Sequence, residues 1–274
     1  MPAKTHYETL HIDKRGPTDW VTLNRPDQLN TMNHRMIDEL LHYFGALIVD
    51  SSVRVVVLRG AGRAFCAGLD LHDSQGDDKA FDLGAGGPSH LLALQRRISE
   101  IVMRMRRAPQ PIISLVHGAA CGGGFALALA SDIRIAGESA KMNAAFIRIG
   151  LSACDIGVSY FLPRLVGVSV ASELMLTGRF IHAERALRVG LVSEVVPDAA
   201  LESAAMSYLD EMLSTAPLGL RLTKDCLTHS INAASLEAAI AMEDRNQVLC
   251  LHTSDFKEGV AAFIEKRVPQ YTDT

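Results

Sequence analysis

The spacing of apolar residues along this chain follows two periods, which predict helices and buried strands in alternation. Apolar side chains recur at helical spacing in residues 33–49, at Met36, Leu40, Leu41, Phe44 and Leu47. Residues 53–58 and 111–116 are instead short, β-branched apolar runs, which are typical of strands covered on both faces. The pattern therefore predicts an amphipathic helix between strands of a buried sheet.

The spacing of apolar residues also predicts elements in the rest of the chain. It predicts strands at residues 7–12, 20–24 and 132–136 and at the end of 187–196, an extended piece at 142–146, helices at 91–107 and 159–166, and loops at 24–30, 73–89 and 150–155. From Asp198 onward the remaining patterns are helical. We expect an α/β body over residues 1–197 and a helical region over 198–274, of the kind that often makes subunit contacts.

Composition narrows the class of protein. The 274 residues are 48% hydrophobic and 21% charged, which is enough apolar material for a core. The formal net charge of −4 gives no electrostatic footprint for nucleic acid. The tight basic cluster Arg104, Arg106 and Arg107 is expected to be a solvated helix end rather than an anion site. We predict a chain without nucleic-acid partners.

Targeting and redox signals are also missing from the sequence. The first residues lack an apolar targeting segment, and no apolar run is long enough to cross a membrane. The five cysteines are an odd number, widely separated and without a CxxC pair, which argues against a disulfide framework or a zinc site. The sequence therefore predicts a soluble cytoplasmic protein that does not act at a membrane and holds no metal.

A glycine-rich stretch follows the strand at residues 111–116. Gly122, Gly123 and Gly124 lead into residues 125–130, which are helix formers or readily buried. The unpaired N–H groups at a helix start, with the positive end of the helix dipole behind them, can hold negative charge on an oxygen. A tight turn without any ligand explains an isolated glycine triplet equally well. Residues 67–70 offer a second glycine-bearing segment, and two N–H donors on one oxygen would form an oxyanion hole.

Acidic residues near these glycines are the candidates for acid–base chemistry. Asp155 lies between apolar neighbours just before a predicted helix, where burial would raise its pKa and the helix start would oppose that rise. A role as helix N-cap fits it equally well. Asp70 and Asp132 are expected to cap backbone groups, and His117 to make a structural hydrogen bond. Patterns for a dinucleotide fold, a serine hydrolase or a zinc protease are lacking.

A combination of motifs in fixed order then identifies a family. The segments are 63–70, 117–124, 131–136, 162–167, 173–178, 186–194 and 258–267. Together they resemble the crotonase (enoyl-CoA hydratase/isomerase) superfamily over nearly the whole chain. The resemblance implies an α/β fold, a spiral of ββα units with a C-terminal helical oligomerisation region. It also implies homotrimers or dimers of trimers, acyl-CoA thioester substrates, and no cofactor, since coenzyme A enters as part of the substrate.

The resemblance also implies roles for individual residues. The oxyanion-hole N–H groups would come from Leu69 and Gly123. The residues expected to bind substrate are Ala64, Ala67, Gly68, Leu69, Gly122, Gly123, Phe146, Phe263 and Lys266. Of these, Phe263 and Lys266 would contact the nucleotide of coenzyme A bound to a neighbouring subunit. Leu69, Phe146 and the 73–89 loop would shape the acyl pocket.

Two departures from the family pattern limit the expected reaction. Ala126 and Phe146 stand where a typical hydratase carries its two glutamates, so hydration by that pair cannot operate with these groups. Asp155 falls close to the functional aspartate of the family's dienoyl-CoA isomerases and 4-chlorobenzoyl-CoA dehalogenase, although Ser99, beside Glu100, replaces the dehalogenase's histidine. We predict a hydratase/isomerase-type enzyme with Asp155 as its single acid–base and Glu100 as a distant second candidate.

Two other functions stay open at this point. The first is an acyl-CoA hydrolase or dehalogenase in which Asp155 acts as the nucleophile. The second is a non-catalytic homologue that still binds acyl-CoA.

Overall fold

The computed structural model describes residues 6–72 and 87–274. Within these residues the strands are β1 (Leu10–Arg15), β2 (Thr18–Leu23), β3 (Val55–Gly60), β4 (Ile112–Val116), β5 (Ala119–Cys121), β6 (Ile133–Gly137), β7 (Lys141–Asn143), β8 (Ile181–His182) and β9 (Glu194–Val196). The α-helices are α1 (His34–Leu47), α2 (Pro88–Arg107), α3 (Gly123–Ala130), α4 (Val158–Thr177), α5 (Ala183–Arg188), α6 (Leu201–Leu213), α7 (Pro217–Ser230), α8 (Leu236–Leu251) and α9 (Ser254–Glu265).

The described strands form a six-stranded sheet in the order β1-β2-β3-β4-β6-β9, parallel except for the β1–β2 hairpin. Successive side chains of a strand point to opposite faces. Val56 and Leu58 of β3 therefore join the core under α1, α2 and α3, while Val55 and Val57 pack with α6 on the other face. The buried strand predicted at residues 53–58 is confirmed, because helices cover both of its faces.

A second, three-stranded sheet in the order β5-β7-β8 lies beside α3. The extended piece predicted at 142–146 is right for Met142 and Asn143 but wrong for its end, since residues 145–149 form a 3₁₀ helix, η3 (Ala145–Ile149). The loop at 150–155 is confirmed. The loop predicted at 73–89 lies mostly outside the described residues, and α2 begins at Pro88.

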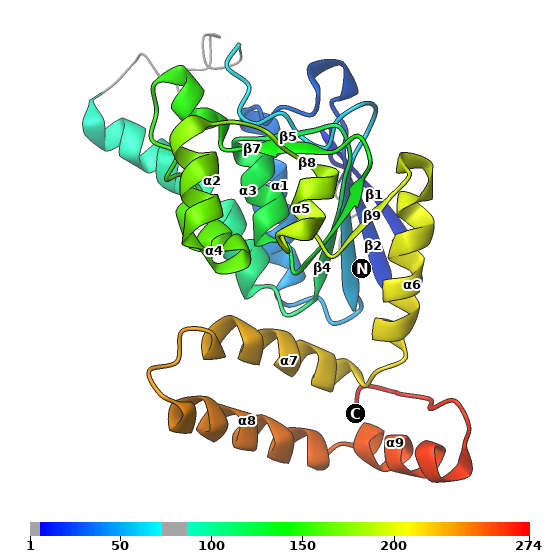
Figure 1. The fold of residues 1–274 in the computed structure, drawn as a ribbon. Helices are drawn as coiled ribbons and strands as arrows, with labels where there is room; N and C mark the ends of the chain where they lie inside the picture. Colours follow the sequence, from blue (N-terminus) through cyan, green and yellow to red (C-terminus); the bar gives the residue numbers. More distant parts are fainter. Residues whose placement is uncertain (1–5, 73–86) are drawn as a thin grey trace.

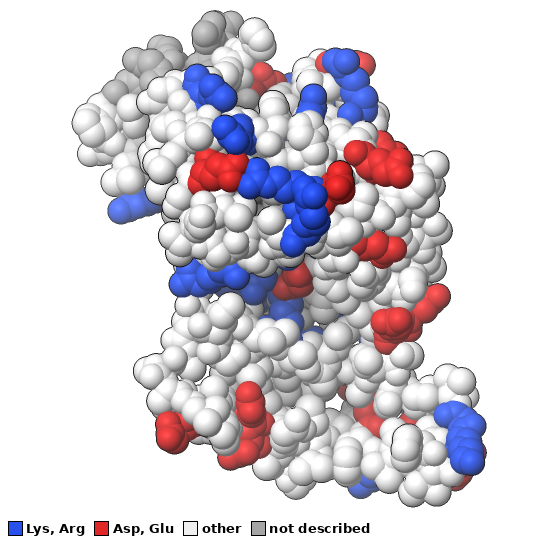
Figure 2. Space-filling model, viewed as in Figure 1, with Lys and Arg blue, Asp and Glu red and all other residues white. Residues whose placement is uncertain are grey.

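The helical end of the chain has two parts that differ in packing. Helix α6 lies on the sheet and buries Leu201, Ala205 and Leu209 there, whereas α7, α8 and α9 lie beyond the body (Figure 1). Helix α8 buries none of its described side chains. On the face drawn in Figure 2, these outer helices carry long stretches without charged side chains. The predicted division into domains at residue 197 stays a prediction.

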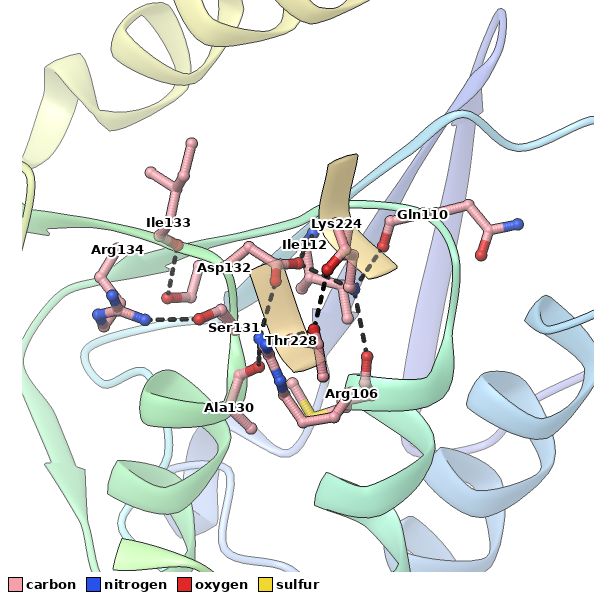
Figure 3. A network of polar contacts seen from close by, with 12 residues as sticks. Arg106, Gln110, Ile112, Ala130, Ser131, Asp132, Ile133, Arg134, Lys224 and Thr228 are labelled. Carbon is pink, nitrogen blue, oxygen red and sulfur yellow. Dashed lines mark hydrogen bonds and ion pairs between the residues drawn. The ribbon is translucent and has the colours of Figure 1, made fainter. Parts of the chain in front are cut away.

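A polar network joins α7 to the body (Figure 3). Lys224 of α7 is 6% exposed, and its ammonium group lies 2.9 Å from the Asp132 carboxylate. Arg106 at the end of α2 also binds Asp132, at 2.8 Å, and donates to the Thr228 hydroxyl. The expectation of a solvated basic helix end is therefore wrong for Arg106, whose guanidinium is committed to this internal contact.

Candidate active site

The two glycine-bearing segments meet in space. The Cys66 N–H donates to the Ala119 carbonyl, and the Cys121 N–H donates back to the Cys66 carbonyl, both at 3.0 Å. These bonds pair the loop around residue 66 with β5 as a short parallel bridge. The contact that the sequence left open is thus made by backbone pairing just before α3.

Glycine is required on both sides of this contact. Gly68 has φ +107°, and a Cβ placed on it would lie 2.9 Å from the Cys121 carbonyl oxygen and 3.7 Å from the Gly123 nitrogen. A Cβ on Gly124 would overlap the Cys66 carbonyl. Any side chain at either position would push the two segments apart.

Among the described residues, the backbone N–H groups of Leu69 and Gly123 at this junction donate to no acceptor. Gly123 is the first residue of α3, so its N–H has no acceptor within the helix. Around Leu69, the Ala67 and Asp70 N–H groups donate to the Leu29 and Met32 carbonyls, but the Leu69 N–H donates to no group within residues 6–72 and 87–274. The predicted donor pair, Leu69 and Gly123, is therefore available to an oxygen, and its catalytic role stays a prediction.

The surroundings of these donors are apolar. The Met32 side chain lies directly against the Gly123 Cα, and the Ile156 Cδ1 would be 3.6 Å from a Cβ placed there. The Phe146 ring would be 3.4 Å from a Cβ on Gly122. Since weakly polar surroundings screen charges poorly, they would strengthen the interaction of these N–H groups with a developing oxyanion.

Asp155 lies next to these apolar side chains, because its neighbour Ile156 packs on Gly123. Its Oδ1 accepts the Ile156 N–H at 2.8 Å and the side-chain amide of Gln95. Burial raises the pKa of Asp155, and these two hydrogen bonds oppose the rise. The N-cap interpretation is wrong, since Gly157 is the N-cap of α4 and no side chain caps that helix.

The other acidic candidates are held in structural contacts. Asp132 accepts the Ile112 N–H at 2.8 Å besides its ion pairs, so its predicted capping role is confirmed. Asp70 accepts the His72 N–H and pairs with Arg25 at 2.8 Å. The hydrogen bonds and ion pairs of these two carboxylates give each of them a structural role, and no catalytic role is needed to account for them.

Glu100 and His117 are likewise accounted for. Glu100 pairs with Arg104 and Arg107 along α2, so its carboxylate is engaged by guanidinium groups. His117 makes the expected structural hydrogen bond, from Nε2 to the Gly62 carbonyl at 2.9 Å. Across residues 6–72 and 87–274, no group of three or more His, Cys, Asp or Glu side chains could hold a metal ion.

The remaining predicted residues fall into two places. Ala64 and Ala67 lie in the loop that pairs with β5. Phe263 and Lys266 lie at the end of α9, on the outer helices (Figure 1). The Phe263 side chain is 86% exposed, so within one chain these two residues do not join the site around Gly123.

Sequence reasoning missed Gln95. It lies one helical turn before Ser99 on α2 and is the one amide side chain on that helix. A polar amide on a helix face that also carries Leu91, Leu92 and Ile98 was the available signal. What the sequence could not reveal was which loop lies opposite that face.

Comparisons with known proteins find relatives that match nearly the whole chain. A family model described as "Enoyl-CoA hydratase/isomerase" matches residues 19–274. A Mycobacterium bovis protein named "Probable enoyl-CoA hydratase" is 43% identical over 92% of this chain and 88% of its own. The Escherichia coli "1,2-epoxyphenylacetyl-CoA isomerase" is 36% identical over 96% of this chain and 97% of its own. The crystal structure of a Bacillus anthracis enoyl-CoA hydratase superposes with a TM-score of 0.90 at 33% identity, covering 97% of this chain and all of that one.

Proposed function

Because this chain belongs to the enoyl-CoA hydratase/isomerase family, we propose that it moves a proton on an acyl-CoA thioester with Asp155 as its single acid–base. The fold expected from the resemblance, a crotonase-like α/β arrangement with helices at the C-terminal end, is confirmed. The proposal goes beyond the family by naming the residues and the type of reaction.

The observation that carries the proposal is the junction of the two glycine segments. The Leu69 and Gly123 N–H groups would donate hydrogen bonds to the thioester carbonyl oxygen, and the α3 dipole would add to the positive potential there. Charge moving onto that oxygen makes a proton on the adjacent carbon removable. The backbone thus supplies the stabilisation, and a side chain has to supply the base.

We propose Asp155 as that base, because its neighbour Ile156 lies against Gly123 at the junction. Burial raises its pKa, which brings a carboxyl group closer to neutral pH and favours proton transfer in both directions. It would take a proton from the carbon next to the carbonyl and return it two carbons further along, so that the double bond shifts and the carboxylate is regenerated. One carboxylate suffices for this isomerisation, whereas hydration also needs an activated water.

The test is Asp155→Asn, which keeps the shape of the side chain and removes its basicity. Hexanoyl-CoA in heavy water reports enolate formation as deuterium uptake beside the carbonyl, and 3-hexenoyl-CoA reports isomerisation. Loss of a positioned acid–base costs about 10²- to 10⁴-fold, so we expect both rates to fall by that factor. Glu100→Gln is the matched control and should keep the parental rates.

Unchanged exchange in Asp155→Asn would overturn the proposal. An acyl group trapped on Asp155 would instead indicate the hydrolase or dehalogenase route. Tight binding of hexanoyl-CoA without any exchange by the parent would favour the non-catalytic homologue.

We also propose that the chain assembles as a homotrimer or a dimer of trimers. Large apolar side chains are exposed on the outer helices, among them Leu236, Val248, Phe263 and Ile264, and burial between copies would remove them from water. Such contacts would allow Phe263 and Lys266 to reach coenzyme A on a neighbouring copy. The molar mass in sedimentation equilibrium tests this, and a monomer would contradict it.

Cellular location and cofactor use stay predictions. None of the described helices has the length and apolar character needed to cross a membrane. The cytoplasmic location and the absence of a metal or redox cofactor are still to be tested.

A further inference from the structure

The two oxygens of the Asp155 carboxylate have different surroundings. Oδ1 accepts both hydrogen bonds, from the Ile156 N–H and from the Gln95 amide. Among the described residues, Oδ2 has no recorded hydrogen-bond donor. One oxygen is therefore held by the protein, and the other is left with its lone pairs free.

We propose that Gln95 is a positioning residue that fixes Oδ1 of Asp155 and leaves Oδ2 as the oxygen that exchanges the proton. This inference rests on the proposed acid–base role of Asp155. The Ile156 N–H belongs to the adjacent residue, and this single hydrogen bond does not by itself fix the orientation of the carboxylate plane. Gln95 comes from a different element, α2, so its bond ties the orientation of the carboxylate to the packing of that helix.

The chemistry of an amide suits this task. An amide N–H stabilises the ionised carboxylate, and it cannot titrate or take the proton itself. No charged group of the described residues contributes to the pKa of Asp155; burial, the Ile156 N–H and the Gln95 amide are what act on it. Gln95 is therefore the one side chain identified as opposing the effect of burial on this carboxylate.

The experiment compares two substitutions with opposite expected signs. Gln95→Met keeps length and helix propensity but removes the donor, so the acid limb of the kcat pH profile should move up by about one pH unit. Gln95→Lys keeps a donor and adds positive charge beside the carboxylate, so the same limb should move down. With Gln95→Met, kcat should also fall about tenfold because the carboxylate is less well oriented, while KM changes little.

Arg96→Met, on the next residue of α2, is the control for altering this helix surface. Its side chain is exposed, and its profile should match that of the parent. Rates are read as deuterium uptake by hexanoyl-CoA, as in the test of Asp155.

The outcomes separate this inference from the function on which it rests. If Asp155→Asn abolishes exchange but both Gln95 variants keep the parental pH profile, the positioning role is wrong and the acid–base role stands. If both Gln95 variants lose activity without any shift of the limb, Gln95 is merely structural and the inference is overturned. If Asp155→Asn keeps full exchange, the proposed function itself has failed.

Discussion

The two ends of helix α3 differ in how their hydrogen-bonding groups are used: those at the C-terminal end are taken up by structural contacts, and those at the N-terminal end belong to the proposed site. At its C-terminal end, the Ser131 carbonyl accepts a hydrogen bond from the guanidinium of Arg134. The adjacent Asp132 has both oxygens engaged, by Arg106, Lys224 and the Ile112 N–H (Figure 3). At its N-terminal end, the Gly123 N–H has no recorded acceptor among the described residues.

The two aspartates near these ends differ in the same way. Asp132 is saturated with donors and cations, so protonation or attack by its oxygens would break the link between α7 and the body. Asp155 is half-buried, and among the described residues it has no cationic partner and no donor to one of its two oxygens. If Asp155 has the proposed acid–base role, unused hydrogen-bonding capacity, rather than the presence of a carboxylate, distinguishes it from a structural aspartate.

The largest effect we expect is on stability, from Asp132→Asn. The change leaves the buried Lys224 ammonium with only neutral acceptors, the Met105 and Gln110 carbonyls. Breaking a buried ion pair by removing one partner costs about 3–5 kcal/mol. We expect a loss of about 3 kcal/mol in the free energy of unfolding, measured by urea denaturation at one fixed protein concentration, because association would add to stability.

Two further variants sharpen that result. Asp225→Asn, also affecting α7, removes a carboxylate that is 56% exposed and pairs with His229, and should cost about 0–1 kcal/mol. Adding Lys224→Met to Asp132→Asn should recover part of the loss, since no buried charge is then left unpaired. A cost for Asp132→Asn no larger than that for Asp225→Asn would show that the network is not what anchors α7.

The next effect is on catalysis, from Gly68→Ala. The added methyl group would meet the Cys121 carbonyl oxygen at 2.9 Å, at a backbone φ of +107°, and would move the Leu69 N–H away from Gly123. Since loss of one oxyanion donor costs about 10²- to 10³-fold, we expect kcat for 3-hexenoyl-CoA to fall about 10²-fold. Gly16→Ala is the control, with φ +59° and nothing within 4 Å. Equal kcat in both variants would exclude a role for the junction.

The sequence predicts much of the fold because buried apolar residues recur along the chain at the spacing of a helix or a strand. The helix predicted at 33–49 is found as α1, with the Asn33 side chain as its N-cap, and the strand at 111–116 is found as β4. Boundaries are less well predicted. The first strand begins at Leu10 rather than at residue 7, since its position is set by pairing with β2 and not by its own residues.

Only part of the site can be predicted from the sequence, because its contacts join segments that are far apart in the chain. The residue types of Gly68, Gly123 and Asp155 mark them as candidates, but no local pattern shows that residues 66 and 120 pair. Gln95 lies 60 positions from Asp155 in the chain, and the start of η3 lies where the end of an extended segment was expected. Contacts between distant segments depend on how whole elements pack, and a single sequence does not encode that in any short motif.

The smallest effect we expect is again on stability, from Asp155→Asn, and its sign at neutral pH is opposite to that of Asp132→Asn. Burial raises the folded-state pKa of Asp155, so the folded chain holds this proton more tightly than the unfolded chain does. Its contribution to stability is therefore greatest below the ordinary carboxyl pKa and is lost as the pH rises through the raised value. Asp155→Asn removes a charge that is costly to bury at neutral pH, and should raise the melting temperature slightly there. The difference should vanish below about pH 4, where this carboxyl group is protonated in both the folded and the unfolded chain. A loss of stability at neutral pH comparable to that of Asp132→Asn would mean that Asp155, too, is a structural residue.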